Sequence, residues 1–181
     1  MGYDLFIRLL NDAILEEQGK TPALPKTETV VDLRIDANLP ERYIASPAAR
    51  MEMYKKISLI AEEADRLDLL AELSDRYGKP PRAVLRLLDV ALVRALGSRN
   101  GIVRVEQKGA DLRFVLDGLN LPAWSVLFSE RNDLKFNRTP PATVVCRTEN
   151  GTDPIETARI LLLRYAAVAA EESAGEEETK K

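Results

Sequence analysis

The sequence predicts an α+β fold in which N-terminal helices are followed by a small, mostly antiparallel sheet closed by a C-terminal helix. Three observations lead to this prediction. Apolar residues recur at helical spacing through roughly the first half of the chain, strand-like alternation replaces that spacing between residues 102 and 146, and a last helical pattern begins at 154. With 181 residues, the chain is expected to form one main domain and a small appendage.

The N-terminal part is expected to begin with a helix over residues 3–17, where two neighbouring rows of apolar residues at i, i+4 spacing form one broad face. Gly19 can end this helix, and the connector at 21–25 contains two prolines and cannot be helical. Residues 29–35 are rich in β-branched and aliphatic side chains, which predicts a strand.

Three further helices are predicted between residues 46 and 97. The first begins at Ser46, an N-cap residue that is followed by a proline, and continues to residue 60. The second begins at the acidic residues Glu62, Glu63 and Asp65 and ends at Gly78. Its expected buried row is Leu67, Leu70, Leu73 and Tyr77. The third, at 82–97, is apolar around most of its circumference and should be the central core helix.

The sheet is predicted from alternating segments at 102–105, 112–116, 134–136 and 143–146, of which the first two form a hairpin. A short helix at 121–130 should turn Trp124 and Leu127 inward, and the last helix should begin at 152–154 and end near Ala170. Residues 171–181 contain five glutamates and two lysines, which predicts a disordered acidic tail.

Composition and charge exclude several classes of function. The net charge of −3 equals the −3 of the last eleven residues, so the body is neutral, unlike a dedicated nucleic-acid-binding module. No histidine is present and Cys146 is the only cysteine, which excludes disulfides, histidine-based triads and zinc sites. No phosphate-binding loop, membrane span or secretory signal is visible, so a cytoplasmic protein without catalytic activity of its own is expected.

Two groups of residues could suggest chemistry but have simpler interpretations. The carboxylates Glu62, Glu63, Asp65 and Asp68 suit the N-terminal turn of a helix better than a metal or acid–base site. Cys146 lies in an apolar strand and is expected to be a buried small side chain rather than a nucleophile.

A polar face on the predicted helix that ends at Gly78 is of more interest. Glu72, Asp75 and Arg76 are spaced at i, i+3 and i+4, and Asp68 extends their face by one turn. Such a face can be a solvated helix surface with an internal Glu–Arg pair, or a charged docking surface for a partner. The pattern alone favours the solvated surface.

Several segments resemble the C-terminal domain of bacterial transcription-repair coupling factors. They are residues 40–44, 49–58 and 84–94, together with the most specific pattern, E-L-x-D-R-(F/Y)-G-x-x-P, at 72–81. Residues 2–6 resemble the segment that directly follows the translocase motor of that family. The resemblance is strong over residues 2–108 and weak over 109–170. It implies a helix and linker at 1–28, a regulatory domain at 29–170 and a tail at 171–181.

The resemblance also implies a function for a larger parent protein. The parent would release stalled RNA polymerase from damaged duplex DNA by ATP-driven translocation, with ATP and magnesium bound in a motor that lies outside this chain. It would recruit UvrA for nucleotide excision repair. This domain, with no catalytic residue, cofactor or metal of its own, would dock on the UvrA-binding module of the same protein and restrain the motor.

Residues carried over from the family contact surface are Glu72, Asp75 and Arg76, with Asp68 on the same face. The resemblance therefore favours a docking surface on this face, whereas the pattern alone favours a solvated helix surface. Two other functions stay open. One is an auxiliary module that contacts DNA or RNA polymerase, and the other, which the sequence favours least, is a small hydrolase.

Overall fold

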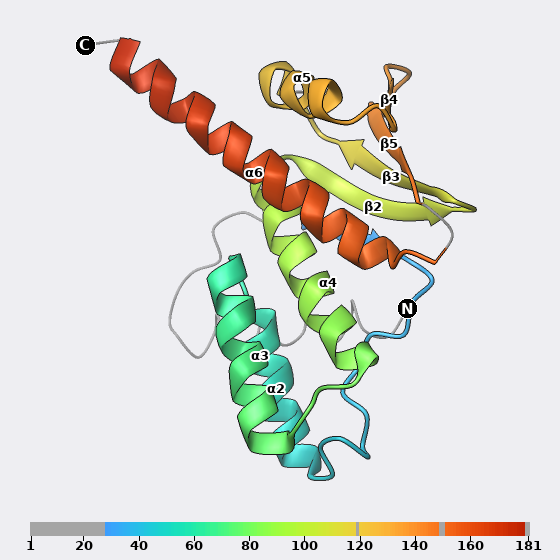
Figure 1. The fold of residues 1–181 in the computed structure, drawn as a ribbon, viewed down its shortest axis with the longest axis vertical. Helices are drawn as coiled ribbons and strands as arrows, with labels where there is room; N and C mark the ends of the chain where they lie inside the picture. The colour runs from blue at the N-terminus through green and yellow to red at the C-terminus, as the bar shows by residue number, and fades with distance from the viewer. Residues whose placement is uncertain (1–27, 119, 149–150, 180–181) are drawn as a thin grey trace.

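The computed structural model describes residues 28–118, 120–148 and 151–179 (Figure 1). Five helices and one five-stranded sheet form the regular structure of these residues, which confirms the α+β class. In chain order they are β1 (Val30–Asp32), α2 (Pro47–Ser58), α3 (Glu63–Tyr77), α4 (Arg82–Arg99), β2 (Ile102–Lys108), β3 (Asp111–Leu116), α5 (Leu121–Glu130), β4 (Leu134–Asn137), β5 (Thr143–Arg147) and α6 (Pro154–Thr179). The helix predicted at residues 3–17 lies outside the described residues.

The sheet has the strand order β1-β2-β3-β5-β4. β1 runs parallel to β2, with Val31 opposite Val105, and every other pairing is antiparallel. β2 and β3 form the predicted hairpin, in which Lys108 is opposite Asp111 and Gly109 takes a positive φ of 62° at the turn. The prediction of a mostly antiparallel sheet is therefore confirmed.

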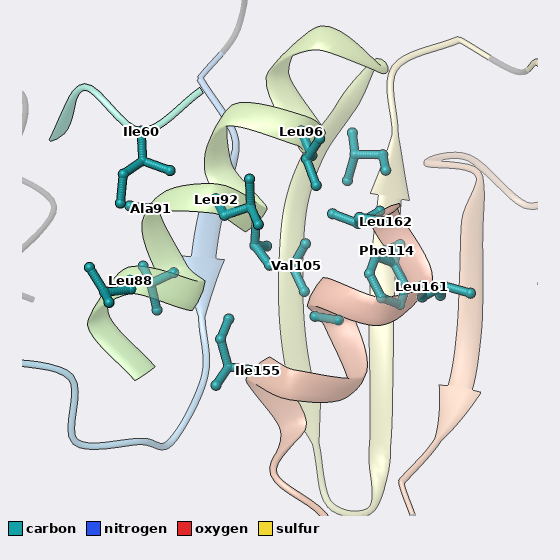
Figure 2. Close-up of a cluster of buried hydrophobic side chains, with 14 of the residues drawn as sticks. Ile60, Leu88, Ala91, Leu92, Leu96, Val105, Phe114, Ile155, Leu161 and Leu162 are labelled. Carbon is teal, nitrogen blue, oxygen red and sulfur yellow. The ribbon is translucent and has the colours of Figure 1, made fainter. Parts of the chain in front are cut away.

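The helices form two groups around α4 (Figure 1). α4 and α6 lie against one face of the sheet, whereas α2 and α3 pack beside α4 on the side away from the sheet. The core fills the space between α4, α6 and the sheet, where side chains from all three meet (Figure 2). Leu88 and Leu92 of α4, Val105 of β2 and Phe114 of β3 are fully buried there. α4 is thus the central core helix, as predicted.

The first strand is attached to α4 at a point of very close approach. A Cβ atom on Gly97 would lie 2.4 Å from Oγ1 of Thr29, so only glycine fits there without a shift of the strand. Thr29 donates from its backbone N–H to Oγ of Ser98 (3.0 Å) and from its hydroxyl to the carbonyl of Ile102 (2.6 Å). The start of β1 is therefore bonded both to α4 and to the start of β2.

The first strand is shorter than the sequence predicts. The expected strand covered residues 29–35, but β1 spans only Val30–Asp32. The backbone N–H of Ile35 donates to the carbonyl of Leu33 at 3.0 Å, which makes a tight turn. The chain leaves the sheet at this turn, so the apolar residues after Asp32 pack without pairing.

The buried row of α3 also differs from the prediction. Leu73 is buried as expected, but the residue buried one turn earlier is Leu69, and Leu67 is 51% exposed. Arg66 is buried on the same side, where its charge is paired with Asp89 of α4. A paired arginine therefore takes a position that periodicity reserves for an apolar side chain.

The last helix is longer than predicted. α6 continues to Thr179, beyond the expected end near Ala170. The composition favours this, because five of the nine residues at 171–179 are glutamate, which is a good helix former. The division at residues 28 and 170 stays a prediction.

Candidate functional site

Helix α3 is defined by clear signals at both ends. At its N-terminus the carboxylate of Asp65 accepts hydrogen bonds from the backbone N–H groups of Ala61 (2.9 Å) and Glu62 (3.0 Å). At its C-terminus Gly78 has a φ of 79° and its N–H donates to the carbonyl of Ser74. Asp65 therefore caps the start of α3, which agrees with the simpler of the two interpretations of these carboxylates.

We use the name ionic face for the exposed side of α3 that carries Asp68, Glu72, Asp75 and Arg76. Glu72 is its most highly connected member. Its Oε1 accepts from Nζ of Lys56 in α2 (2.6 Å) and from Nη1 of Arg76 (2.8 Å). Glu52 of α2 lies 3.6 Å from both cations. The structure thus joins two predicted residues to two residues of α2 that the sequence analysis did not select.

Hydrogen bonding shifts the acidity of these groups. The bonds donated by Lys56 and Arg76 lower the pKa of Glu72, and the same contacts raise the pKa of Lys56 and of Arg76. The side chains of Glu72 and Arg76 are 32% and 39% exposed, so water screens the network and its contribution to stability is small. Its effect is to hold Glu72 and Arg76 in fixed positions on the surface.

The two aspartates of the ionic face differ from Glu72 and Arg76. Asp68 and Asp75 are exposed, and within the described residues neither forms an ion pair. Helical spacing places both on the side of α3 that carries Glu72. The ionic face therefore presents two carboxylates that are free to pair with cations of a partner. They lie next to Glu72 and Arg76, which already form an ion pair with each other.

A shallow cleft runs beside the ionic face between α2 and α3. Its volume is about 260 Å³, and Lys56, Asp68 and Glu72 line it together with the apolar side chains of Leu59 and Leu69. Leu59 is 59% exposed. The surface next to the charges thus also offers a small apolar area to a partner.

A buried ionic cluster ties α3 to the rest of the domain. Asp89 of α4 accepts from Nε of Arg66 at 2.6 Å and lies 3.3 Å from Nε of Arg159 in α6. Glu63, at the start of α3, is within 3.2 Å of both arginines. Burial raises the pKa of Asp89, although the two arginines act in the opposite direction. The sequence analysis did not foresee this cluster.

In the described ranges, no three histidine, cysteine or acidic side chains are grouped so that they could hold a metal ion. None of the helices in the described part of the chain combines the length and the apolar character needed to cross a membrane. The arrangement on α3 is suited to ionic recognition of another protein surface.

The comparison with known families extends over this site. A model of the TRCF domain matches residues 33–120, which include all of α3 and its ionic face. Residues 33–120 form a TRCF domain. α5, β4, β5 and α6 follow the matched region.

Curated relatives agree with this assignment. The transcription-repair-coupling factor of Staphylococcus aureus is 36% identical over 110 residues, which cover 60% of this chain and 9% of that protein. The factor of Staphylococcus epidermidis is 34% identical over 119 residues, 64% of this chain and 10% of that protein. The chain thus spans about a tenth of the length of the curated relatives that it matches.

A solved structure extends the likeness beyond the matched residues. The crystal structure of the C-terminal domain of transcription-repair coupling factor aligns with a TM-score of 0.69 at 26% identity. The alignment covers 82% of this chain and 96% of that one. The chain therefore has the fold of that C-terminal domain.

Cys146 lies in β5, far from the ionic face along the chain, and is fully buried. Its thiol donates to Oδ2 of Asp133 at 3.1 Å. Arg131 binds the same carboxylate through two nitrogens and lowers the pKa of Asp133 to about 2. Burial, with the Asp133 hydrogen bond, raises the pKa of Cys146 to about 12. The thiol is therefore neutral, as the sequence analysis expected of a structural cysteine.

We expect the native domain to resist alkylation at Cys146. At pH 8 a thiol with a pKa of about 12 is almost entirely protonated, so its reaction with iodoacetamide should be at least about a hundredfold slower than that of the urea-unfolded chain. Mass spectrometry of samples quenched over time measures both rates. Equal rates in the folded and unfolded states would contradict the buried, neutral thiol.

Proposed function

We propose that this TRCF domain is a regulatory docking module of a transcription-repair coupling factor. It binds through its ionic face to the UvrA-binding module of the same protein and so restrains the motor. The observation that carries the proposal is the exposure of Asp68 and Asp75, without an ion pair in the described chain, beside the fixed Glu72–Arg76 pair. The family assignment and the solved C-terminal domain support it.

The proposed role of the parent protein follows from the family. It uses ATP and magnesium in its motor to translocate on duplex DNA, releases stalled RNA polymerase at damage and recruits UvrA for nucleotide excision repair in the cytoplasm. This domain supplies no catalytic group to those steps. Its part is to keep the parent in a closed state until a partner binds the open state.

The physics of the ionic face suits a reversible latch. Two modules on one chain meet at an effective concentration on the order of millimolar, so an intrinsic affinity of about −4 kcal/mol half-closes the contact. Charged contacts of this strength can be displaced. A partner that binds the open state about a hundredfold more tightly shifts the balance by about 2.7 kcal/mol.

Reversal of the two free charges tests this proposal. The double variant Asp68→Lys/Asp75→Lys should bind the separately purified UvrA-binding module at least about tenfold more weakly than the unaltered chain, because attractive contacts become repulsive. Calorimetric titration measures both affinities. Exposed helix positions tolerate such changes, so the melting temperature should move little.

Asp111→Lys provides a matched control, because Asp111 is exposed at the turn of the β2–β3 hairpin, across α4 from α3 (Figure 1). It should leave the affinity unchanged. In the full-length parent, the double variant should raise ATPase activity and UvrA binding. Equal affinities for all three chains would rule out the ionic face as the docking surface. Strongly salt-dependent binding of the chain to duplex DNA would then favour the auxiliary DNA-contacting module.

A further inference from the structure

A second surface, remote from the ionic face, lies where α5 meets the end strand β4 (Figure 1). A groove of about 340 Å³ opens there. Its apolar lining comes from Leu121, Trp124 and Phe128 of α5 and from Leu134 and Phe136 of β4. Phe128 stands between the other two aromatic rings, with its centroid 6.3 Å from that of Trp124 and 6.3 Å from that of Phe136. The groove is therefore a preformed apolar pocket.

One side of β4 has no partner strand. β4 is the last strand in the order of the sheet and pairs only with β5, within the residues that the structure describes. Across the same described ranges, no backbone hydrogen bond outside that ladder involves residues 134–137. A free edge presents N–H and C=O groups to which an extended segment can add as a further strand.

The side chains of β4 alternate in a way that sets the pattern of such a segment. Leu134 and Phe136 line the groove, whereas Lys135 and Asn137 are exposed and do not. A strand added next to β4 would likewise send every second side chain toward the groove and the others toward Lys135. The groove accepts apolar side chains, and the other side faces a cation.

The charge around the groove is positive. Arg138 lines the groove and is exposed, and neither Arg138 nor Lys135 forms an ion pair within the described chain. The nearby carboxylates are already bound, Glu130 by Arg164 and Asp133 by Arg131. An incoming segment therefore meets two uncompensated cations, and acidic side chains would pair with them.

We propose that the free edge of β4 and this groove bind an extended segment of another protein in which acidic residues alternate with apolar ones. The segment adds a sixth strand to the sheet, places an apolar side chain in the groove and sets alternate carboxylates beside Lys135, while a carboxylate at its end pairs with Arg138 at the groove. A second copy of this chain fits less well, because an antiparallel pairing of two β4 strands brings four cations together. A single-stranded nucleic acid also fits less well, since the ring of Trp124 is 2% exposed and lies 4.6 Å from that of Tyr165.

The experiment uses the whole 181-residue chain and synthetic peptides, with Trp124, the only tryptophan, as the fluorescent reporter. The probe is a capped heptapeptide in which glutamate alternates with valine and phenylalanine. It should change the fluorescence of Trp124 in a saturable way. A version with lysine in place of glutamate should bind at least about tenfold more weakly, and a version with alternate backbone nitrogens methylated to block edge pairing should not bind.

Variants of the chain locate the site. Lys135→Glu/Arg138→Glu should weaken binding of the acidic peptide about tenfold or more, and the control Lys79→Glu, exposed just after α3, should leave it unchanged. Equal binding of the acidic and basic peptides would overturn the proposal, as would full binding of the methylated peptide. So would a lack of binding by the acidic peptide, or its displacement by an oligodeoxythymidine that binds more tightly.

Discussion

Replacement of Leu88 by aspartate should abolish the cooperative folding of this domain. Leu88 is fully buried in the middle of α4, with the core side chains shown in Figure 2. The substitution removes an apolar side chain, at about 2–5 kcal/mol, and buries a carboxylate among apolar core side chains, which costs several kcal/mol more. The sum is comparable to the whole stability of a small domain, about 5–15 kcal/mol.

Far-ultraviolet circular dichroism with urea titration measures this effect. The matched control is Ile160→Asp on α6, where the side chain is 51% exposed. The control should lose no more than about 1 kcal/mol, most of it from the lower helix propensity of aspartate. A cooperative transition of the Leu88 variant within about 1 kcal/mol of the unaltered chain would contradict the central position of α4.

The second largest effect is expected at the buried ionic cluster. Asp89→Ala should lower the free energy of unfolding by about 3–5 kcal/mol, because it leaves the buried guanidinium of Arg66 with only its contact to Glu63. Asp89→Asn keeps the shape of the side chain and removes its charge. Its free energy of unfolding should lie between those of the unaltered chain and of Asp89→Ala. Thermal or urea unfolding at neutral pH measures both variants.

A surface pair gives the comparison. Glu130→Ala removes an ion pair with Arg164 in which the side chains are 38% and 45% exposed. Its effect should stay below about 1 kcal/mol, since water already screens that pair. If Asp89→Ala cost no more than Glu130→Ala, the cluster would not be what attaches α3 to α4 and α6.

The elements that the sequence predicts well are those with local signals. The N-cap at Ser46, the glycine stop at Gly78 and the hairpin turn at Gly109 are each specified by residues close together in the chain, and the structure has all of them. The apolar circumference of α4 likewise identified the core helix. Local chemistry does not reveal the early end of β1, because the tight turn after Leu33 lies in a stretch that looks like strand.

The candidate site shows the same division between local and long-range information. Helical spacing correctly placed Glu72 and Arg76 within bonding distance of each other. The contribution of Lys56 depends on how α2 crosses α3, which no spacing within either helix specifies. Buried and exposed charges also look alike in a sequence, so periodicity could not tell Arg66, which is buried, from Asp68, which is not. The docking role of the ionic face itself stays a prediction.

The bonds of Thr29 to α4 and β2 have a mechanical consequence. Tension that reaches the domain from residues before Glu28 enters at a short edge strand that is hydrogen-bonded to the last turn of α4 and to the first residue of β2. When the force is directed along β1, the hydrogen bonds between β1 and β2 are loaded in shear. They then resist the force at the same time rather than breaking one after another. The load therefore passes straight into the core helix, and the α2–α3 hairpin with its charged surface is left unstretched.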